Sequence, residues 1–385
     1  MWDRLPSCQS PTATVSVPCA VPTRFDAVSV TRLIGKGDRV WWLRGDMLTI
    51  IARPKERWAM LCCAIQQPLE PIAGTEFAGA TVRIPDIAHA IFDVDIAPGE
   101  MVNRPTVRGP LAPPAPPRVD KLAGTMTSIA FPSKQLGEKR QVTVYVPASS
   151  PPGKLLPVFY LADGGAYTFA PIAEAAVKDG TARPAILVGI ENAQGEATGC
   201  LILPACDRRS LEYLPLTNSD KVNGPFARHL RFVVDELIPF VEAHFPASPQ
   251  RTDRVIGGYS NGGVWAIEGA ARQPDVFGNV LVMSAGMRGT VKSAALLGRA
   301  MVYGGGGTME GDFGPNTMAD VAAAHAAGAI TCSRLLVAGH SNDAWDIMFS
   351  EAYSWMLPPE GHKLLNRKSV CAPISPTALV RYPPL

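Results

Sequence analysis

The sequence of 385 residues has no long apolar run, no cluster of basic residues and no cysteine pairs at metal-binding spacing. Without the roughly 20 consecutive apolar residues that span a bilayer, the chain is predicted to have no transmembrane helix and no membrane partner. A formal net charge of +2, with no run of Lys and Arg, gives no indication of a nucleic-acid partner. The absence of an HExxH motif and of CxxC pairs predicts no metal site. What is present is 47% hydrophobic and 18% charged residues, the composition of a well-folded protein.

Residues 1–23 also lack a clean signal peptide, because they hold a single basic residue and prolines interrupt every apolar stretch. We therefore expect a cytoplasmic location. This favours reduced, buried thiols over a disulfide framework for the eight cysteines. In an exported protein, Cys8 with Cys19 and Cys200 with Cys206 would be the candidate pairs.

The chain is predicted to divide into five segments. Residues 1–25 form an N-terminal extension. Short β-branched and aromatic runs separated by Gly, Asp or Pro, such as AVSVTRLIG and DRVWWLRG, predict a small antiparallel β-sandwich over residues 26–100. Six prolines between Pro105 and Pro117 indicate a linker at 101–122. The largest segment follows at 123–358, and a C-terminal tail at 359–385.

The larger segment alternates apolar strands with amphipathic helices. Runs such as LLPVFYLAD, AILVGIE, RVIGGYS and RLLVAGH are bounded by Gly, Asp or Pro, and helical patterns lie between them. Continuous apolar strands that alternate with helices predict an α/β fold, with a mostly parallel sheet covered by helices on both faces. In that architecture, active sites lie beyond the carboxyl ends of the strands.

Ser260 stands in the sequence GYSNG, a G-x-S-x-G match between an expected strand and an expected helix. Glycines allow the tight turn that lifts a serine hydroxyl above a sheet. The alternative is that Ser260 is a turn residue or a helix N-cap. We interpret Ser260 as the nucleophile.

A serine nucleophile needs a base, and a base needs an acid. Of the six histidines, His340 alone follows an expected buried strand and opens a loop. Glu310 follows the strand that ends near Tyr303, and Asp312 is its local rival. The order Ser, Glu, His along the chain is that of α/β-hydrolases. The chemistry of such a triad requires no organic cofactor.

Acyl transfer also requires two N–H donors for the developing oxyanion. The amide of Asn261, directly after the serine, is one candidate. The loop in YLADGGAY supplies the other, with Gly165 as the predicted donor and with Asp163 and Tyr167 at the mouth of the pocket. By itself, Asp-Gly-Gly is an ordinary turn.

From about Arg108 to Trp355 the chain resembles the esterase D superfamily of α/β-hydrolases, and most specifically its enterochelin esterase (Fes-like) branch. The stretches that carry this resemblance are GPLAPPAP, YLADGGAY, DRRSLEYLP, DELIPFVEAHF, GGYSNGG, GGTMEGDF and AGHSNDAW. The segment VTRLIGKGDRVWWLRGDM also resembles the immunoglobulin-like domain that precedes the catalytic domain in that branch. The resemblance therefore implies an α/β-hydrolase fold preceded by an Ig-like β-sandwich.

The resemblance implies the roles of nucleophile for Ser260, base for His340 and acid for Glu310, with Gly165 and Asn261 at the oxyanion hole. Relatives often have an aspartate directly after the histidine, whereas here two residues intervene before Asp343, which leaves Asp343 as a further candidate acid.

The resemblance also implies substrate contacts in DRRSLEYLP, where Arg208 and Arg209 would bind an anionic, catecholate-rich substrate. The alternative is that either arginine pairs with Glu212.

These patterns predict a serine carboxylic-ester hydrolase that acts on a small-molecule or carbohydrate-linked ester. A siderophore trilactone is one candidate substrate, and a feruloyl or acetyl ester on a polysaccharide is another. An acyltransferase of the same superfamily and a non-catalytic binding module are the alternatives. The sequence does not indicate an oligomeric state.

Overall fold

A computed structural model describes residues 5–10, 17–55, 59–62, 65–97, 105–149, 153–197, 206–215, 223–286 and 290–360. Cys200 and nearly all of the expected C-terminal tail lie outside these ranges. The chain divides into two compact units. The smaller contains residues 1–114 together with 306–314 and 335–344, and the larger contains the remainder.

The smaller unit is built on an antiparallel sheet with the strand order β1-β7-β3-β2, and β6 pairs with β7. Apolar side chains of β3 and β7, among them Leu48, Ile50 and Val82, form its core. The antiparallel sheet therefore agrees with the strand patterning, whereas the Ig-like assignment stays a prediction. The strands of this unit are β1 (Cys19–Val21), β2 (Arg39–Arg44), β3 (Met47–Ala52), β4 (Met60–Leu61), β5 (Gln67–Pro68), β6 (Glu70–Pro71), β7 (Ala78–Arg83), β8 (Ile91–Asp93), β9 (Ile96–Ala97) and β10 (Thr106–Arg108).

The run AVSVTRLIG was expected to be a strand, and this was wrong: it forms helix α1 (Ala27–Ile34). Asp26 caps the helix by accepting a hydrogen bond from the Ser29 amide. Val30 and Ile34, one turn apart, are the buried residues of α1, and Gly35 ends it at φ 56°. Capping and i,i+4 burial therefore outweigh the β-branched composition of this run.

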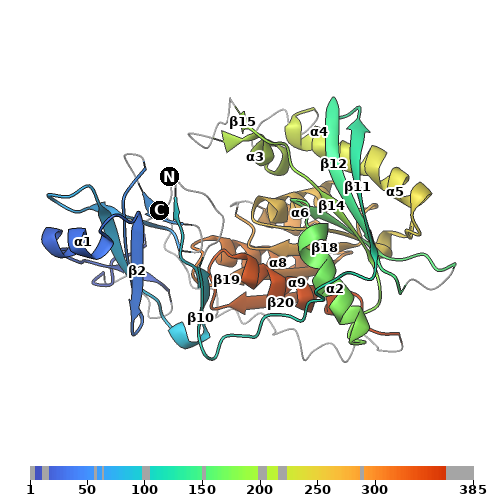
Figure 1. Cartoon of the computed structure of the whole chain (residues 1–385). Helices are drawn as coiled ribbons and strands as arrows, with labels where there is room; N and C mark the ends of the chain where they lie inside the picture. The colour runs from blue at the N-terminus through green and yellow to red at the C-terminus, as the bar shows by residue number, and fades with distance from the viewer. Residues whose placement is uncertain are drawn as a thin grey trace. The chain divides into compact units, whose positions relative to one another are not determined.

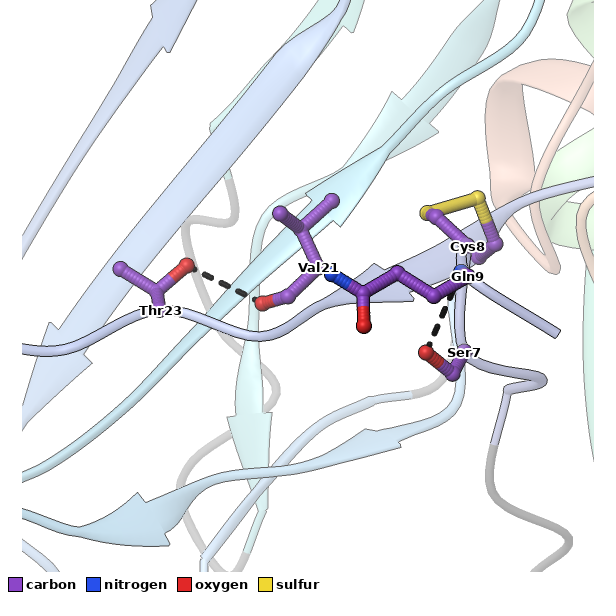
Figure 2. Close-up of a disulfide and its surroundings, with 6 residues drawn as sticks. Ser7, Cys8, Gln9, Val21 and Thr23 are labelled. Atoms are coloured by element: carbon purple, nitrogen blue, oxygen red, sulfur yellow. Dashed lines mark hydrogen bonds between the residues drawn. A yellow bond between two sulfur atoms is a disulfide. The ribbon is translucent and has the colours of Figure 1, made fainter.

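The expectation of reduced cysteines was also wrong. Cys8 and Cys19 form a disulfide with each other (Figure 2). Cys62 and Cys332 each take part in a disulfide as well. Cys19 lies on edge strand β1, so part of the expected N-terminal extension belongs to the sheet. Disulfides persist mainly in oxidising compartments. The cytoplasmic location stays a prediction.

Replacing Cys8 by serine is expected to lower the free energy of unfolding of the smaller unit by about 2–3 kcal/mol, because the bond closes a short loop of the unfolded chain. The two cysteines are 11 residues apart. Urea unfolding would measure the loss, and the double variant Cys8→Ser/Cys19→Ser should lose no more than the single one. Alkylation of Cys8 in native, unreduced protein would contradict the bond.

The larger unit is built on a mixed eight-stranded sheet with the order β11-β12-β14-β13-β17-β18-β19-β20. The long strands β11 and β12 lie side by side (Figure 1) and pair antiparallel, whereas β14, β13, β17, β18 and β19 pair parallel. Its strands are β11 (Thr125–Ser133), β12 (Glu138–Val146), β13 (Val158–Ala162), β14 (Ile186–Ile190), β17 (Arg254–Tyr259), β18 (Asn279–Met283), β19 (Met301–Gly307) and β20 (Ile330–Leu336), beside a short β15 (Glu196–Ala197) and β16 (Cys206–Asp207) pair.

Helices pack on both faces of this sheet, as the patterning predicted. Phe159 of β13 lies against Phe349 and Tyr353 of α9, whereas its neighbour Tyr160 belongs to the core cluster that includes Trp265 of α6. Adjacent strand residues point to opposite faces, so α9 and α6 cover different faces. The helices are α2 (Ala166–Lys178), α3 (Arg208–Tyr213), α4 (Pro225–Arg231), a π-helix (Phe232–Leu237), α5 (Ile238–His244), α6 (Asn261–Arg272), α7 (Val291–Ala294), α8 (Phe313–Ala326) and α9 (Asn342–Met356), with single 3-10 turns at Ile87–His89 and Arg251–Asp253.

Within the described ranges, no helix is both long and apolar enough to cross a membrane.

Candidate active site

Ser260 occupies the corner between β17 and α6 in a strained backbone conformation. Its φ of 57° and ψ of −128° are rare for a residue with a side chain. It stands at the N-cap position of α6, yet its side chain makes no capping hydrogen bond. The interpretation of Ser260 as a helix cap is therefore not supported, because a cap stabilises its helix through that bond. A strained backbone at a half-buried serine is the kind of outlier that clusters at functional sites.

The glycines around Ser260 are required by close packing. A Cβ on Gly258 would lie 2.7 Å from the backbone of Gly262. A Cβ on Gly262 would lie 2.7 Å from the Cβ of Ala162 at the end of β13. Both distances are too short for a side chain, so this corner packs directly against the loop that follows β13.

Glu310 and His340 form a buried acid–base pair. A carboxylate oxygen of Glu310, Oε2, lies 2.8 Å from Nδ1 of His340. The other oxygen, Oε1, accepts the amide hydrogen of Gly307 at 2.5 Å. Glu310 is fully buried and His340 is 8% exposed. The carboxylate thus holds the Nδ1 side of the imidazole.

The sequence left three carboxylates open as the partner of His340, and the one hydrogen-bonded to it is Glu310. Asp343 instead pairs with Arg108, whose Nη2 lies 2.8 Å from Oδ2. Asp312 lies two residues beyond Glu310, after Gly311 at φ 62°. The ring of Phe313 packs 4.3 Å from the ring of His340.

The two predicted oxyanion donors differ in their hydrogen bonding. Asn261 is the first residue of α6, a position at which the amide has no acceptor within its own helix. The amide of Gly165 donates to the carbonyl of Ala162 at 3.1 Å, and that of Gly164 donates to Ile190 at 3.0 Å. The Gly165 hydrogen is thus engaged in its own turn, and its role as a donor stays a prediction.

Asp163 belongs to a buried polar cluster beside that loop. Its carboxylate binds Arg209 through two bonds, at 2.6 Å to Nε and 2.7 Å to Nη2, and accepts from Asn192 at 2.8 Å. Its amide donates to the hydroxyl of Tyr213 at 3.0 Å. Burial acts to lower the pKa of Arg209, but the hydrogen bonds and charge of Asp163 outweigh it and raise that pKa above its ordinary value.

Neither arginine of DRRSLEYLP pairs with Glu212 as the alternative interpretation supposed. Glu212 forms a buried two-bond ion pair with Arg140, at 2.7 Å for each bond. Arg209 is committed to Asp163, whereas Arg208 pairs with Glu138 at 2.8 Å and its side chain is 45% exposed. Arg208 is therefore the arginine of the pair that remains open to solvent.

Tyr167 lies on the first turn of α2, and its side chain is 52% exposed. Its hydroxyl is hydrogen-bonded to Ser128 of β11, and that bond lowers the pKa of the tyrosine.

Glu191 is a residue that sequence reasoning missed. It directly follows β14, and its carboxylate lies so near Gly164 that a Cβ there would meet Oε1 at 2.1 Å. Burial raises the pKa of Glu191, and the neighbouring charge of Asp163 raises it further. Its position after the strand AILVGI was the available signal, because polar residues at the carboxyl ends of parallel strands line such sites.

The predicted site residues fall into two groups by unit. Ser260, Asn261, Gly165, Asp163 and Arg209 belong to the larger unit, and Glu310 and His340 to the smaller. Among the residues that the structure describes, no group of three or more His, Cys, Asp or Glu side chains could hold a metal ion.

Comparisons with known proteins bear on the family and the fold. The model of a family described as "Putative esterase" matches residues 133–347, more than half of the chain. A search among curated proteins finds no match.

Among solved structures, the enterochelin esterase from Shigella flexneri is similar with a TM-score of 0.59 and 17% identity, over 88% of this chain and 100% of that one. The enterobactin esterase from Shigella flexneri, solved in the presence of enterobactin, has a TM-score of 0.58 and 17% identity over 86% of this chain and 99% of that one. For the ferric enterobactin esterase from Salmonella typhimurium the TM-score is 0.55, with 17% identity over 86% of this chain and 98% of that one. The likeness establishes the fold, and the prediction of an α/β-hydrolase fold is confirmed.

Proposed function

The chain belongs to the Esterase family, and from this premise we propose that it is a serine carboxylic-ester hydrolase that works through an acyl-enzyme intermediate. Ser260 is the nucleophile, His340 the general base and Glu310 the acid that orients it. The proposal goes beyond family membership because it assigns each step of the reaction to a residue.

The reaction proceeds in two halves. Ser260 Oγ forms a bond to the ester carbonyl carbon while His340 Nε2 takes the hydroxyl proton. The tetrahedral oxyanion is stabilised by the amide of Asn261 and by the amide of Gly165, whose hydrogen must turn away from the Ala162 carbonyl to reach it. As the intermediate collapses, the bond to the leaving alcohol breaks and His340 returns the proton to it. Water then attacks the acyl-enzyme, again with His340 as base, and the acid is released.

The observation that carries the proposal is the backbone of Ser260. Ser260 is held at φ 57° at a helix N-terminus, and its side chain makes no capping bond. Its strain is therefore not offset by stabilisation of the helix. The Glu310–His340 pair gives independent support, because a buried carboxylate on Nδ1 fixes the tautomer in which Nε2 accepts a proton. Ser260, Glu310 and His340 each follow the carboxyl end of a strand of one sheet, β17, β19 and β20.

For the substrate we propose a siderophore-type ester with catecholate groups. The similar solved structures whose names state enterobactin or enterochelin esterase cover 85–88% of this chain, which extends the likeness beyond the catalytic region. The exposed Arg208 offers a cation to an anionic substrate.

Covalent labelling and product analysis test this proposal. A fluorophosphonate should modify one serine, and the labelled peptide should contain Ser260. Hydrolysis of p-nitrophenyl acetate and butyrate would then be compared with that of a catecholate trilactone and of feruloyl esters. An added alcohol acceptor separates hydrolysis from acyl transfer, because a transferase forms a new ester with it. A label on another serine would reject the nucleophile, and faster turnover of feruloyl esters would reject the substrate class.

The two arginines are expected to respond differently to replacement by alanine. Arg209→Ala leaves the 8%-exposed Asp163 carboxylate without its cation and should lower the free energy of unfolding by about 3 kcal/mol. Arg208→Ala breaks a solvent-exposed pair and should cost less than about 1 kcal/mol. It should also raise KM for the catecholate ester about 5-fold, since one surface charge contributes about 1 kcal/mol.

Thermal or urea unfolding and steady-state kinetics measure these effects. A neutral p-nitrophenyl ester is the control, for which Arg208→Ala should leave KM unchanged. Equal KM values for wild type and Arg208→Ala on the anionic ester would reject the substrate contact of Arg208.

A further inference from the structure

The segment that carries His340 is built into a ribbon with strands of the N-terminal part of the chain. Ile91 of β8 forms a parallel bridge with Ala338. Its amide donates to Val337 at 2.9 Å, and its carbonyl accepts from Gly339 at 2.8 Å. On the other side, the amides of Thr308 and Met309 donate to Leu336 and Ala338 at 2.9 and 3.0 Å. All of these residues belong to the smaller unit.

A side chain of β10, the strand paired with β8, binds the chain just after His340. Arg108 of β10 lies directly opposite Ile91 in the antiparallel register of β8 and β10. It binds Asp343 through Nη2 at 2.8 Å, and through Nη1 it donates to the carbonyl of Pro113. Ile91 therefore binds residues 337–339 before His340, and Arg108 binds Asp343 after it.

Apolar packing joins the same segments. Met309, adjacent to Glu310, is 1% exposed and belongs to the core cluster formed by β3, β7 and β8. Val337 packs against that cluster. The acid and the base are thus carried by chain that is packed into the core of the smaller unit.

We propose that β8 and β10 act as a clamp that positions His340 for proton transfer, with Arg108 as the positioning residue whose side chain completes it. The inference rests on the proposed function, in which His340 is the base. It gives β8 and β10 of the smaller unit a part in the reaction.

The physical reason is the small tolerance of proton transfer for misplacement. A general base must lie within hydrogen-bond reach of the proton that it takes, and a displacement of about 1 Å costs up to about 100-fold in rate. Arg108 also occupies the Asp343 carboxylate, the nearest acid beyond His340 along the chain, so that Glu310 is left as the partner of the imidazole. Loss of Arg108 frees that carboxylate and one end of the loop.

Kinetics on the full chain test the clamp. Arg108→Ala should lower kcat on p-nitrophenyl butyrate about 10-fold with KM changed less than about 2-fold, because chemistry rather than binding is disturbed. Arg108→Lys keeps one of the two contacts and should recover about half of that loss on a logarithmic scale. Asp343→Asn should lose about 5-fold, and the double variant Arg108→Ala/Asp343→Asn no more than Arg108→Ala, because both remove one interaction.

The matched control is Arg118→Ala. Arg118 pairs with Asp346 of the same helix α9, but both residues belong to the larger unit. This variant also breaks an Arg–Asp pair at α9 and should keep kcat within about 2-fold of wild type, since an exposed pair contributes little by itself.

Hydrogen exchange supplies a second readout. In Arg108→Ala, amides of a peptide covering residues 335–344 should exchange about 10-fold faster, while those of β17 should not change.

The outcomes separate the two proposals. If Ser260→Ala abolishes activity but Arg108→Ala matches Arg118→Ala in kcat and in exchange, the clamp falls and the proposed function stands. If wild type hydrolyses no ester, the proposed function falls and the catalytic part of the clamp falls with it. A rise in KM alone would also overturn the clamp, because it would place Arg108 at the substrate.

Discussion

Ser260→Ala is expected to lower kcat/KM for p-nitrophenyl butyrate by roughly 10⁵-fold, because the variant has no group that can form the acyl-enzyme. His340→Ala should lose a similar amount, since a serine hydroxyl without a base is a poor nucleophile at neutral pH. The double variant should be no slower than either single one, because the two residues act as one unit. Initial rates at substrate concentrations below and above KM measure all three.

The fold of each variant is the control for this result. Ser260 makes no capping bond, so its replacement should leave circular dichroism unchanged, and the strain at φ 57° persists for alanine as for serine. An active Ser260→Ala protein would reject the nucleophile. In that case the hydrolysis would have to come from another hydroxyl, and fluorophosphonate labelling would identify it.

Glu310→Gln is expected to lower kcat by roughly 10³- to 10⁴-fold with little change in KM. The amide that replaces the carboxylate can present an N–H to Nδ1 and so stabilise the wrong imidazole tautomer. It also removes the negative charge that stabilises the imidazolium formed when His340 takes a proton. Glu310 is fully buried and is hydrogen-bonded to both the Gly307 amide and the imidazole of His340, so the change acts directly on the base.

Asp343→Asn and Asp312→Asn are the matched controls for Glu310→Gln. Each removes one of the two other carboxylates that the sequence left open, and each should lose less than about 10-fold because the hydrogen bond to Nδ1 of His340 comes from Glu310. If Asp343→Asn were the more damaging change, the acid would be Asp343, and the Glu310–His340 bond would be only structural. The comparison needs kcat rather than a single-concentration rate, so that binding and chemistry are not confused.

Local sequence was enough to predict the corner at Ser260. A strand, a serine between glycines and a helix are all set by neighbours within about ten residues, and the structure shows β17, Ser260 and α6 in that order. The alternation of apolar runs and amphipathic stretches likewise predicted the α/β sheet, because burial of a parallel strand on both faces leaves a continuous apolar run. The strand prediction for Ala27–Ile34 was wrong because it used composition alone. Its β-branched residues fit a strand, and only the Asp26 cap and burial at Val30 and Ile34 decided for a helix.

The sequence did not predict which charged residues form ion pairs with one another. Arg209 pairs with Asp163, 46 residues away, and Arg108 pairs with Asp343, 235 residues away. Nearby sequence offered Glu212 as an alternative partner for either arginine, but Glu212 pairs with Arg140. Ion pairs depend on which side chains the fold brings together in a buried place, and sequence distance carries little of that information.

The sequence by itself determined the α/β architecture, the strained serine corner and a short set of candidate acids and bases, because these follow from local propensity and periodicity. Only the tertiary structure decided that Glu310 is the carboxylate on His340, that Asp343 is taken by Arg108, and that Ile91 grips the loop before the histidine. The reason is physical. Each of these choices is a contact between segments far apart in the chain, fixed by backbone hydrogen bonds and burial that exist only once the fold has formed.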